Sequence, residues 1–415
     1  MSYLKYEEAL EILKKYNQTH LLNHYEGLNN SEKQNLLSDI SKIDFELMQQ
    51  LYNISVQNTS NTKATDKIEP IEYLDSADYK NNEHYLNIGK EVLKRNELAV
   101  ITMAGGQGTR LGHKGPKGTY ILDVDGGKSL FQLLCESLKL ANSQYNTEIP
   151  WYIMTSRANN QETIEFFEKN NYFGYNKDNI IFFIQRELPM LLEDGKIVLE
   201  SKSKIKFGAD GHGGVFYAIH NLGILDDMKS RNIKWVFMGG VDNCLLKMAD
   251  PVFIGLCEEM GYKGASRTIE KNGPFERIGT FCMKNGRPAV IEYTEINEEL
   301  ANLKDDKGEY VYNQGHIVEN MFNISFVESL KEEKMPYHVA HKVTSYIDEN
   351  GNEITPESPN AFKYEAFLFD AFEKMEKVLL YKVIREEEFA PLKRAEGEES
   401  PATVKELYNN FHKNR

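Results

Sequence analysis

A glycine-rich run could bind phosphate groups in this chain. Residues 104–112 read AGGQGTRLG, and Pro116-Lys117-Gly118 follows closely. Glycines let backbone N–H groups approach a nucleotide without side-chain obstruction, and exposed amides complement phosphate charge. Arg110 can bind two phosphate oxygens at once, whereas Lys117 supplies a compact charge. The structural alternative is a glycine turn with surface cations, but the run directly follows an apolar segment, which favours phosphate binding.

Two familiar phosphate-binding motifs do not fit this glycine spacing. A dinucleotide fingerprint reads GxGxxG, and counting from Gly106 places Leu111 where the third glycine belongs. A Walker A loop reads GxxxxGK[ST], and counting back from Gly127 finds Leu122 instead of glycine. The first mismatch argues against an NAD-dependent oxidoreductase, which the α/β pattern described below would otherwise favour.

A second candidate is an acid at the end of an apolar segment. Residues 236–243 read VFMGGVDN, so Asp242 follows a run that is typical of a buried strand. Carboxylate oxygens are the hard ligands that Mg²⁺ needs to bridge phosphates, and Mn²⁺ is the alternative metal. An ordinary turn or N-cap aspartate is the structural alternative. Together with the glycine run, the pattern favours metal binding by Asp242.

The third candidate is the loop Asp210-Gly211-His212-Gly213-Gly214, which stands just before a helical pattern. Such a loop could hold a base or a sugar against its backbone amides, with His212 donating a hydrogen bond. A glycine-rich connector with a solvated histidine is equally compatible with these residues. Three further polar residues are weak signals when taken one at a time, namely Glu292, Asn313 and Lys393.

Alternating strand and helix patterns position these residues. Strands are expected at 98–105, 151–156, 179–185, 233–240, 278–283, 288–294 and 378–384. Helices are expected at 80–96, 129–142, through Ile164 and Phe167, and at 214–230, 316–331 and 359–377. This alternation predicts an α/β fold with a mostly parallel sheet covered by helices on both faces. Ligands of such sheets sit beyond the carboxyl ends of the strands.

Three regions are expected along the chain. Residues 1–95 form an N-terminal helical region, in which 1–57 carry helical periodicity and 58–70 are polar and turn-rich, as in a linker. Residues 96–394 form the catalytic domain. Residues 395–415 form an acidic, weakly helical tail that is expected to pack loosely.

Composition limits the partners and the compartment. The net charge of −14 argues against nucleic-acid or anionic-membrane partners, because those surfaces attract basic patches. The first residues, MSYLKYEEALEILKKYN, lack the apolar core of a signal peptide, and the apolar runs are too short to span a bilayer. Four scattered cysteines show no metal-ligand spacing and are expected to be reduced and mostly buried. A cytoplasmic protein is therefore expected.

These motifs together resemble the eukaryotic-type UDP-N-acetylhexosamine (UDP-N-acetylglucosamine) pyrophosphorylases and the related UTP–sugar-1-phosphate uridylyltransferases. The resemblance covers about residues 20 to 403, and MAGGQGTRLG with PKG looks like the family's nucleotide-binding signature. The other family motifs follow in the family's order: FIQRELPML, DGHGG, VDNCLLKMADPVFIG, EYTEI, PNAFKYEAFLFDAF and EFAPLKRA. The family fold is a mixed, Rossmann-like (GT-A-like) nucleotide-diphospho-sugar transferase sheet flanked by helices, with an N-terminal helical unit.

The resemblance implies a role for each matching residue. UTP would contact the loop residues Ala104, Gly105 and Gly106, and also Gln185 and Gly211 further along the chain. The phosphates would meet Arg110, Lys117 and Lys393, and Asp242 would hold Mg²⁺. The sugar pocket would be lined by His212, Gly279, Glu292, Asn313 and Phe367, with Lys363 near the phosphate.

Two departures from the family pattern bear on substrate and assembly. The hexosamine enzymes usually carry Asn where this chain has His212 and His316, and His at the first position is more similar to the glucose-1-phosphate and broad-specificity branches. The resemblance implies a UDP-sugar-forming uridylyltransferase for N-acetylglucosamine-1-phosphate, with glucose-1-phosphate or a broad range of hexose-1-phosphates as the alternative. N-acetylgalactosamine- and galactose-1-phosphate also stay open. The chain ends soon after Lys393, so we expect it to lack the C-terminal domain that relatives often carry. The resemblance consequently predicts no oligomeric state.

The implied reaction is an in-line attack of the sugar-1-phosphate oxygen on the α-phosphorus of UTP. That oxygen is already ionised at neutral pH, so the enzyme's task is charge neutralisation and alignment. A UDP-sugar-binding protein without catalysis is the remaining alternative, and it would bind ligand without Mg²⁺-dependent turnover.

Overall fold

The computed structural model describes residues 4–58, 66–332 and 335–413. The chain divides into two compact units, each built from separate stretches of sequence. Unit 1 combines Met1–Thr65, Arg186–Gly214 and Met335–Leu368, and unit 2 combines Asp66–Gln185, Val215–Lys334 and Phe369–Arg415. This division differs from the expected boundaries at 95 and 394, because residues 66–95 belong to unit 2 and two internal segments belong with the N-terminal helices.

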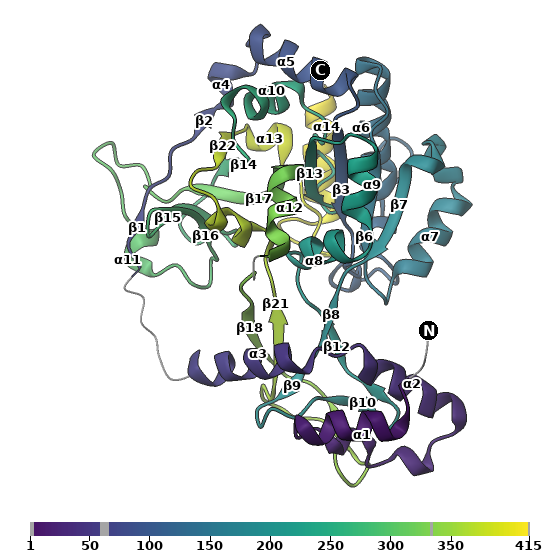
Figure 1. The fold of residues 1–415 in the computed structure, drawn as a ribbon. Coiled ribbons are helices and arrows are strands. Elements are labelled where there is room, and N and C mark those ends of the chain that lie inside the picture. The colour runs from purple at the N-terminus through teal and green to yellow at the C-terminus, as the bar shows by residue number, and fades with distance from the viewer. Residues whose placement is uncertain (1–3, 59–65, 333–334, 414–415) are drawn as a thin grey trace. The chain divides into compact units, whose positions relative to one another are not determined.

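Unit 2 is built on a mixed, 11-stranded sheet (Figure 1). Its main path runs β2-β22-β14-β17-β13-β3-β6-β7, and β1, β15 and β16 extend it from β17. Neighbours along β13, β3, β6 and β7 are parallel, whereas β17 runs antiparallel to both β13 and β14. The main strands are β2 (Leu74–Asp75), β3 (Leu98–Met103), β6 (Trp151–Thr155), β7 (Ile180–Ile184), β13 (Trp235–Gly240), β14 (Gly264–Glu270), β17 (Gln314–Asn323) and β22 (Leu379–Lys382). The side strands are β1 (Ile68–Glu69), β15 (Thr280–Lys284) and β16 (Arg287–Ile291), and a separate hairpin joins β4 (Ile121–Leu122) to β5 (Lys128–Ser129).

Helices cover this sheet and enclose a large apolar core that includes Trp151, Phe237 and Phe253. They are α4 (Ser76–Tyr79), α5 (Glu83–Lys94), α6 (Leu130–Tyr145), α7 (Asn160–Lys169), α8 (Gly214–Asn221, which begins at the last residue of unit 1), α9 (Ile224–Ser230), α10 (Pro251–Met260), α11 (Glu298–Ala301), α12 (Ile324–Ser329), α13 (Arg385–Glu388) and α14 (Pro401–Lys413). Figure 1 shows α5 against α10. Glycines make this contact close, because a Cβ on Gly89 would lie 1.8 Å from the Pro251 carbonyl oxygen. Helix α5 is therefore part of unit 2 rather than of an N-terminal helical region.

Unit 1 joins three N-terminal helices to short strands from the two internal segments. The helices are α1 (Tyr6–Lys15), α2 (Asn30–Ser41) and α3 (Phe45–Asn58). The strands are β8 (Glu187–Pro189), β9 (Leu191–Leu192), β10 (Leu199–Ser201), β11 (Lys204–Ile205), β12 (Phe207–Ala209), β18 (His338–Lys342), β19 (Tyr346–Ile347), β20 (Glu353–Ile354) and β21 (Ala361–Glu365). One apolar cluster contains Leu13, Leu36 and Leu51 from the helices together with Leu191 and Phe362 from the strands.

Three expectations about local structure are wrong. The helix expected at 316–331 is most of strand β17 followed by the short helix α12, and the helix expected at 359–377 is strand β21 followed by a 3₁₀ turn at Leu368–Lys374. The tail expected to pack loosely forms α14, whose Val404 and Tyr408 are buried in an apolar cluster with Leu122. In the first two cases the stretches carry apolar residues that suit either period, so the pattern alone does not separate a strand from a helix.

The other strands and helices expected between 80 and 294, and the strand at 378–384, are present with shifted ends, and the fold class is confirmed. The helix expected at 214–230 is interrupted at Gly223, which has a φ of 74° and separates α8 from α9. Most of the linker expected at 58–70 lies outside the described residues. All four cysteines are buried and unpaired, and no described helix is long and apolar enough to cross a membrane. The cytoplasmic location stays a prediction.

Candidate functional site

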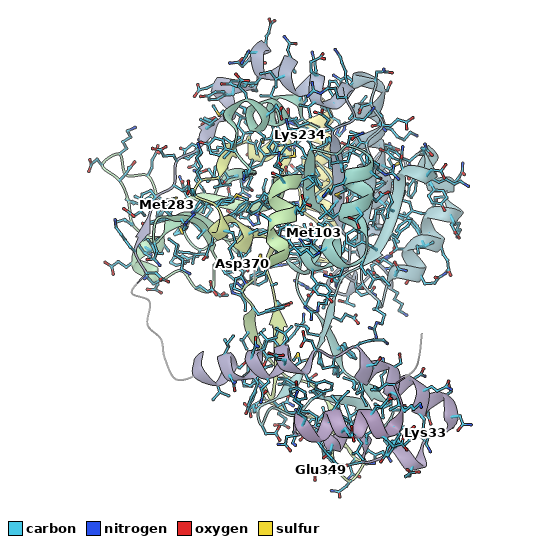
Figure 2. The ribbon with its side chains drawn as sticks, viewed as in Figure 1. Lys33, Met103, Lys234, Met283, Glu349 and Asp370 are labelled. Carbon is cyan, nitrogen blue, oxygen red and sulfur yellow. The ribbon has the colours of Figure 1, made fainter. Side chains whose placement is uncertain are left out.

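The glycine-rich run forms a loop at the carboxyl end of β3. Figure 2 labels Met103, the last residue of that strand. The loop folds back on itself, because Gly108 N–H donates to Gly115 O at 2.9 Å and Lys117 N–H donates to Gly106 O at 3.0 Å. A Cβ on Gly105 would lie 2.7 Å from Gln185 Oε1, so a larger residue there would displace the Gln185 amide from its present position. The structure thus brings together the loop and Gln185, two parts of the expected nucleotide site.

A cluster of charges forms where β13 ends. Lys117 Nζ donates to Asp242 Oδ2 at 3.1 Å, and their side chains keep 18% and 25% of their surface exposed. Burial opposes ionisation of Asp242, but Lys117 and Lys393 outweigh it and lower the pKa of this carboxyl below its ordinary value. Lys393 itself donates to Glu399 at 2.8 Å. The cluster is therefore an ionised carboxylate between two lysines that remain partly accessible.

Backbone pairing with a distant segment brings Lys393 to this cluster. Leu392 N–H donates to Asp242 O at 2.9 Å, and Asn243 faces Pro391 in an antiparallel bridge. The Asn243 side chain is 3% exposed and fixes the pairing, since its Oδ1 accepts from Ala390 N–H at 2.9 Å. Its amide nitrogen donates to Glu319 Oε1 at 2.8 Å. Asn243 therefore joins the segment that carries Asp242 to the segment that carries Lys393.

A buried ionic network lies behind Asn243. Glu319 is fully buried and accepts from Arg267 Nη1 at 3.0 Å, and Arg267 Nη2 donates to Asp250 at 2.8 Å. Burial raises the pKa of Glu319 to about 8, although Arg267 opposes the shift. The preceding residue, Val318, has a φ of 59° at a bulge in β17. Such a conformation is an outlier for a β-branched residue, and here it stands next to the acid that supports Asn243.

Arg110 is tied to the same segment through its main chain. Ala395 N–H donates to Arg110 O at 3.1 Å, and the Arg110 side chain is exposed. Within the described residues, no hydrogen bond or ion pair holds its guanidinium. Arg110 is thus placed beside Lys393 by the backbone while its charged group stays available for a ligand.

The residues expected to line the sugar pocket fall into two groups. In unit 2, a Cβ on Gly279 would lie 3.3 Å from Glu292 Oε1, and the Asn313 carbonyl accepts from Lys271 N–H at 2.9 Å. His316 donates its backbone N–H to Gly279 O at 2.8 Å, but its ring is 5% exposed and packs edge-on against Phe281 and two other phenylalanines, Phe369 and Phe372. The ring of His316 therefore belongs to the core.

In unit 1, the glycine–histidine loop packs on residues 366–368. Gly211 has a φ of 83°, and a Cβ there would lie 2.3 Å from Ala366 O. His212 Nδ1 accepts from Leu368 N–H at 3.0 Å, so in the neutral ring Nε2 carries the proton and can donate to a ligand. The His212 ring lies 5.4 Å from that of Phe367. Lys363 donates to Glu365 at 2.7 Å and remains partly exposed.

Asp242 is the carboxylate that a divalent cation would use. The described residues hold no group of three or more His, Cys, Asp or Glu side chains placed to bind a metal. Mg²⁺ commonly takes one or two carboxylates and completes its shell with substrate phosphates and water. An ionised, partly exposed Asp242 fits that pattern, provided that the phosphates supply the remaining ligands.

Sequence reasoning missed two residues that hold the loop and the cluster. Asn159 is 1% exposed, and its amide nitrogen donates to Ala104 O at 3.0 Å and to Gly106 O at 3.3 Å. Asn243 supports Asp242 as described above. Both follow a buried strand, as Asp242 does, so the same signal of a polar residue after a strand end would have found them.

Known proteins resemble this chain over most of its length. The family model of UTP–glucose-1-phosphate uridylyltransferases matches residues 45–398. A probable UDP-N-acetylglucosamine pyrophosphorylase of Dictyostelium discoideum is 37% identical over 418 residues, covering 95% of this chain and 86% of the relative. The UDP-N-acetylglucosamine pyrophosphorylase of Saccharomyces cerevisiae is 36% identical, covering 94% and 87%. The crystal structure of the Trypanosoma brucei UDP-N-acetylglucosamine pyrophosphorylase with an inhibitor superposes with a TM-score of 0.84 at 28% identity, covering 98% and 84%. By the extent of these matches, the chain belongs to the UTP–glucose-1-phosphate uridylyltransferase family.

Proposed function

We propose that this chain is a uridylyltransferase that converts UTP and N-acetylglucosamine-1-phosphate into UDP-N-acetylglucosamine and pyrophosphate. The observation that carries the proposal is the cluster of Lys117, Asp242 and Lys393, which lies at the carboxyl end of β13 beside the exposed Arg110. Such a cluster suits polyphosphate chemistry, in which positioning and charge neutralisation supply most of the catalysis. The names of the relatives support the choice of sugar.

The chain's own charges would perform the transfer. The sugar-phosphate oxygen attacks the α-phosphorus of UTP, the new P–O bond forms, and the bond to the β-phosphate oxygen breaks. Arg110 and Lys117 neutralise the departing pyrophosphate, and Lys393 neutralises the attacking phosphate. In the free protein Lys117 is paired with Asp242. Incoming phosphates would therefore replace one anionic partner of this lysine with another. A divalent ion, when bound by Asp242 and the phosphates, supplies further charge stabilisation.

Other residues would bind the two ends of the substrates. Ala104, Gly105 and Gly106 present their backbone to UTP, and Gln185 reaches the uracil from beside Gly105. Gly279, Glu292 and Asn313, which all belong to unit 2, would contact the sugar. In unit 1, Gly211 would contact UTP, whereas His212, Lys363 of β21 and Phe367 would contact the sugar and its phosphate.

One observation favours a second substrate. His212 donates from Nε2, a single hydrogen-bond donor, where hexosamine enzymes usually carry an Asn amide with both donor and acceptor. A hydroxyl partner suits that donor as well as an acetamido oxygen does. Glucose-1-phosphate is therefore the second candidate, and the matching family is that of the UTP–glucose-1-phosphate uridylyltransferases.

Pyrophosphate release tests these alternatives. Purified protein is mixed with UTP, Mg²⁺ and one of four sugar-1-phosphates: N-acetylglucosamine, N-acetylgalactosamine, glucose or galactose. Release with N-acetylglucosamine-1-phosphate at the highest kcat/KM supports the proposal, and preference for glucose-1-phosphate supports the second candidate. Binding of UDP-sugar without any turnover would contradict both and leave a binding protein.

A further inference from the structure

A buried acid in the glycine–histidine loop has no place in the mechanism above. Asp210 follows β12 and is fully buried. Its backbone joins separate segments of unit 1, since its N–H donates to Arg186 O at 3.2 Å and its carbonyl accepts from Ala366 N–H at 2.7 Å. Its carboxyl lies against Gly214, where a Cβ would be 2.0 Å from Oδ1. The backbone hydrogen bonds of Asp210 therefore hold the loop in place without a contribution from its carboxyl group.

The carboxyl itself is unsatisfied. Neither oxygen of Asp210 has a hydrogen-bond partner among the described residues. A buried carboxylate without partners is strongly disfavoured, and such a group commonly takes up a proton instead. Burial raises the pKa of Asp210 to about 7, although the charges of Arg186 and Lys363 act against the shift.

The charged neighbours shift the equilibrium between the ionised and the protonated form of Asp210. Arg186 and Lys363 favour the ionised form of Asp210, whereas Glu187 disfavours it. Glu365 also stands on β21, paired with Lys363, and His212 lies in the same loop with its Nδ1 bound to Leu368 N–H. Of these groups, Lys363 is the one expected to meet a phosphate, so a ligand changes the field at Asp210 through that lysine.

We propose that Asp210 takes up a proton from solvent when a phosphorylated ligand binds to Lys363 and the glycine–histidine loop, so that binding of the nucleotide sugar is linked to pH. The inference rests on the proposed function for the nature of the ligand. A bound phosphate adds negative charge and offsets Lys363, and both effects favour the neutral acid. Asp210 is a positioning residue in this scheme, because it touches the loop rather than the reacting atoms.

Linkage fixes the sign and the pH window. Binding takes up fewer than one proton in the region around and above pH 7, because there the free protein is partly ionised and the complex is protonated. Uptake vanishes near pH 5, where Asp210 is protonated in both states. Affinity consequently falls as pH rises from 7 to 8.5, by at most roughly tenfold per pH unit for one linked proton.

Titration calorimetry with UDP-N-acetylglucosamine tests the inference on the whole 415-residue chain. This ligand is a diphosphate diester with no titrating phosphate near neutral pH, so any exchanged proton belongs to the protein. Binding heats measured at pH 7.5 in buffers of different ionisation enthalpy give the number of protons. Asp210→Asn keeps the shape of the side chain and removes its proton, and a thermal melt checks that this variant is folded. His212→Asn is the matched control for the other titrating group of the loop.

Proton uptake in the wild type and the His212→Asn variant, with none in Asp210→Asn, is the expected result. Binding without uptake, release of protons, or uptake that persists in Asp210→Asn would each overturn the role of Asp210. Should Asp210→Asn fail to fold, the wild-type and His212→Asn proton counts at pH 5 and 7.5 decide, because uptake must vanish at pH 5. Complete absence of binding would instead count against the proposed function, and the inference would fall with it.

Discussion

Asp242 in unit 2 and Asp210 in unit 1 both follow a strand, yet their surroundings are opposite. Asp242 is partly exposed, paired with Lys117 and ionised at all physiological pH values. Asp210 is fully buried, without a hydrogen-bond partner among the described residues, and burial raises its pKa to about 7. The contrast separates two tasks: a permanent charge suits the neutralisation of phosphates, whereas a movable proton suits a group that responds to a ligand.

The largest effect on turnover is expected from the loss of a cation near Asp242. Lys117→Ala and Arg110→Ala should each lower kcat by about 10²–10³-fold, by analogy with the loss of one transition-state donor. Steady-state pyrophosphate release measures the effect. Lys229→Ala is the control, because Lys229 also pairs with a carboxylate, Glu328, but at an exposed site. Near-normal turnover in Lys117→Ala or Arg110→Ala would remove that residue from the proposed mechanism.

The two acids should respond to pH in opposite directions. A buried acid whose folded pKa is raised binds its extra proton only in the folded state, so stability falls as pH rises from the ordinary value of 3.8 toward about 7. Asp210→Asn removes this loss and should be more stable than the wild type at pH 8, by up to about 4 kcal/mol relative to their difference at pH 4. Urea unfolding at the two pH values measures it. A pH-independent difference would show that Asp210 does not titrate in this range.

Asp242→Asn is the counterpart of that experiment. The folded pKa of Asp242 is lowered, so its carboxylate contributes stability above the ordinary pKa, and this contribution is lost as pH falls through the folded value. The variant should therefore be less stable than the wild type at pH 7, and the difference should shrink in strong acid. Unfolding curves at pH 7 and pH 3 test this, and an equal difference at both would contradict the role of Lys117 and Lys393.

A smaller effect is expected where Asn243 joins Asp242 to the segment of Lys393. Asn243→Ala removes the hydrogen bonds that Asn243 makes with Glu319 Oε1 and Ala390 N–H, and it should cost about 1–3 kcal/mol of folding free energy. Turnover should fall as well, because Lys393 loses its support. Asn221→Ala is the control, since it removes an exposed amide that donates to the Tyr217 carbonyl of its own helix. Equal stability of the two variants in urea would refute the supporting role.

The smallest effect concerns the sugar. His212→Asn restores the amide that hexosamine enzymes usually carry and should shift kcat/KM toward N-acetylhexosamine phosphates relative to hexose phosphates. One hydrogen bond is involved, so we expect a change of a few-fold to roughly tenfold. The panel of four sugar-1-phosphates measures the ratio. His220→Asn, outside the loop, serves as the comparison. Identical sugar preferences in the wild type and both variants would contradict the role of His212 in sugar selection.

The sequence predicted most of unit 2 because its parallel strands are buried on both faces. Such strands are continuous apolar runs, as in β3 and β13, and the residues that follow them lie at one edge of the sheet. Arg110, Lys117 and Asp242 were found in this way. β17 was mistaken for a helix because Ile317, Met321 and Phe322 recur at helical spacing, although the strand is buried and bent by its bulge.

The remainder depends on contacts between distant segments, which a single sequence does not reveal. Lys393 reaches Asp242 only through the pairing of Pro391 with Asn243. Asp210 was part of a predicted loop, but its burial results from Gly214 and from the segment of Ala366. For the same reason the composition of unit 1 from three stretches was not predicted.

That composition has a consequence for the order of events during synthesis. The N-terminal helices bury Leu13 and Leu36 in a cluster with Phe362 and Tyr364, residues that follow more than three hundred positions later. At about 5–20 residues per second, the ribosome needs on the order of 15–60 s to supply them. Throughout that interval the first helices expose apolar surface that their own segment cannot cover. Unit 2, by contrast, can begin to assemble its parallel strands β3 and β6 as soon as residue 155 has emerged.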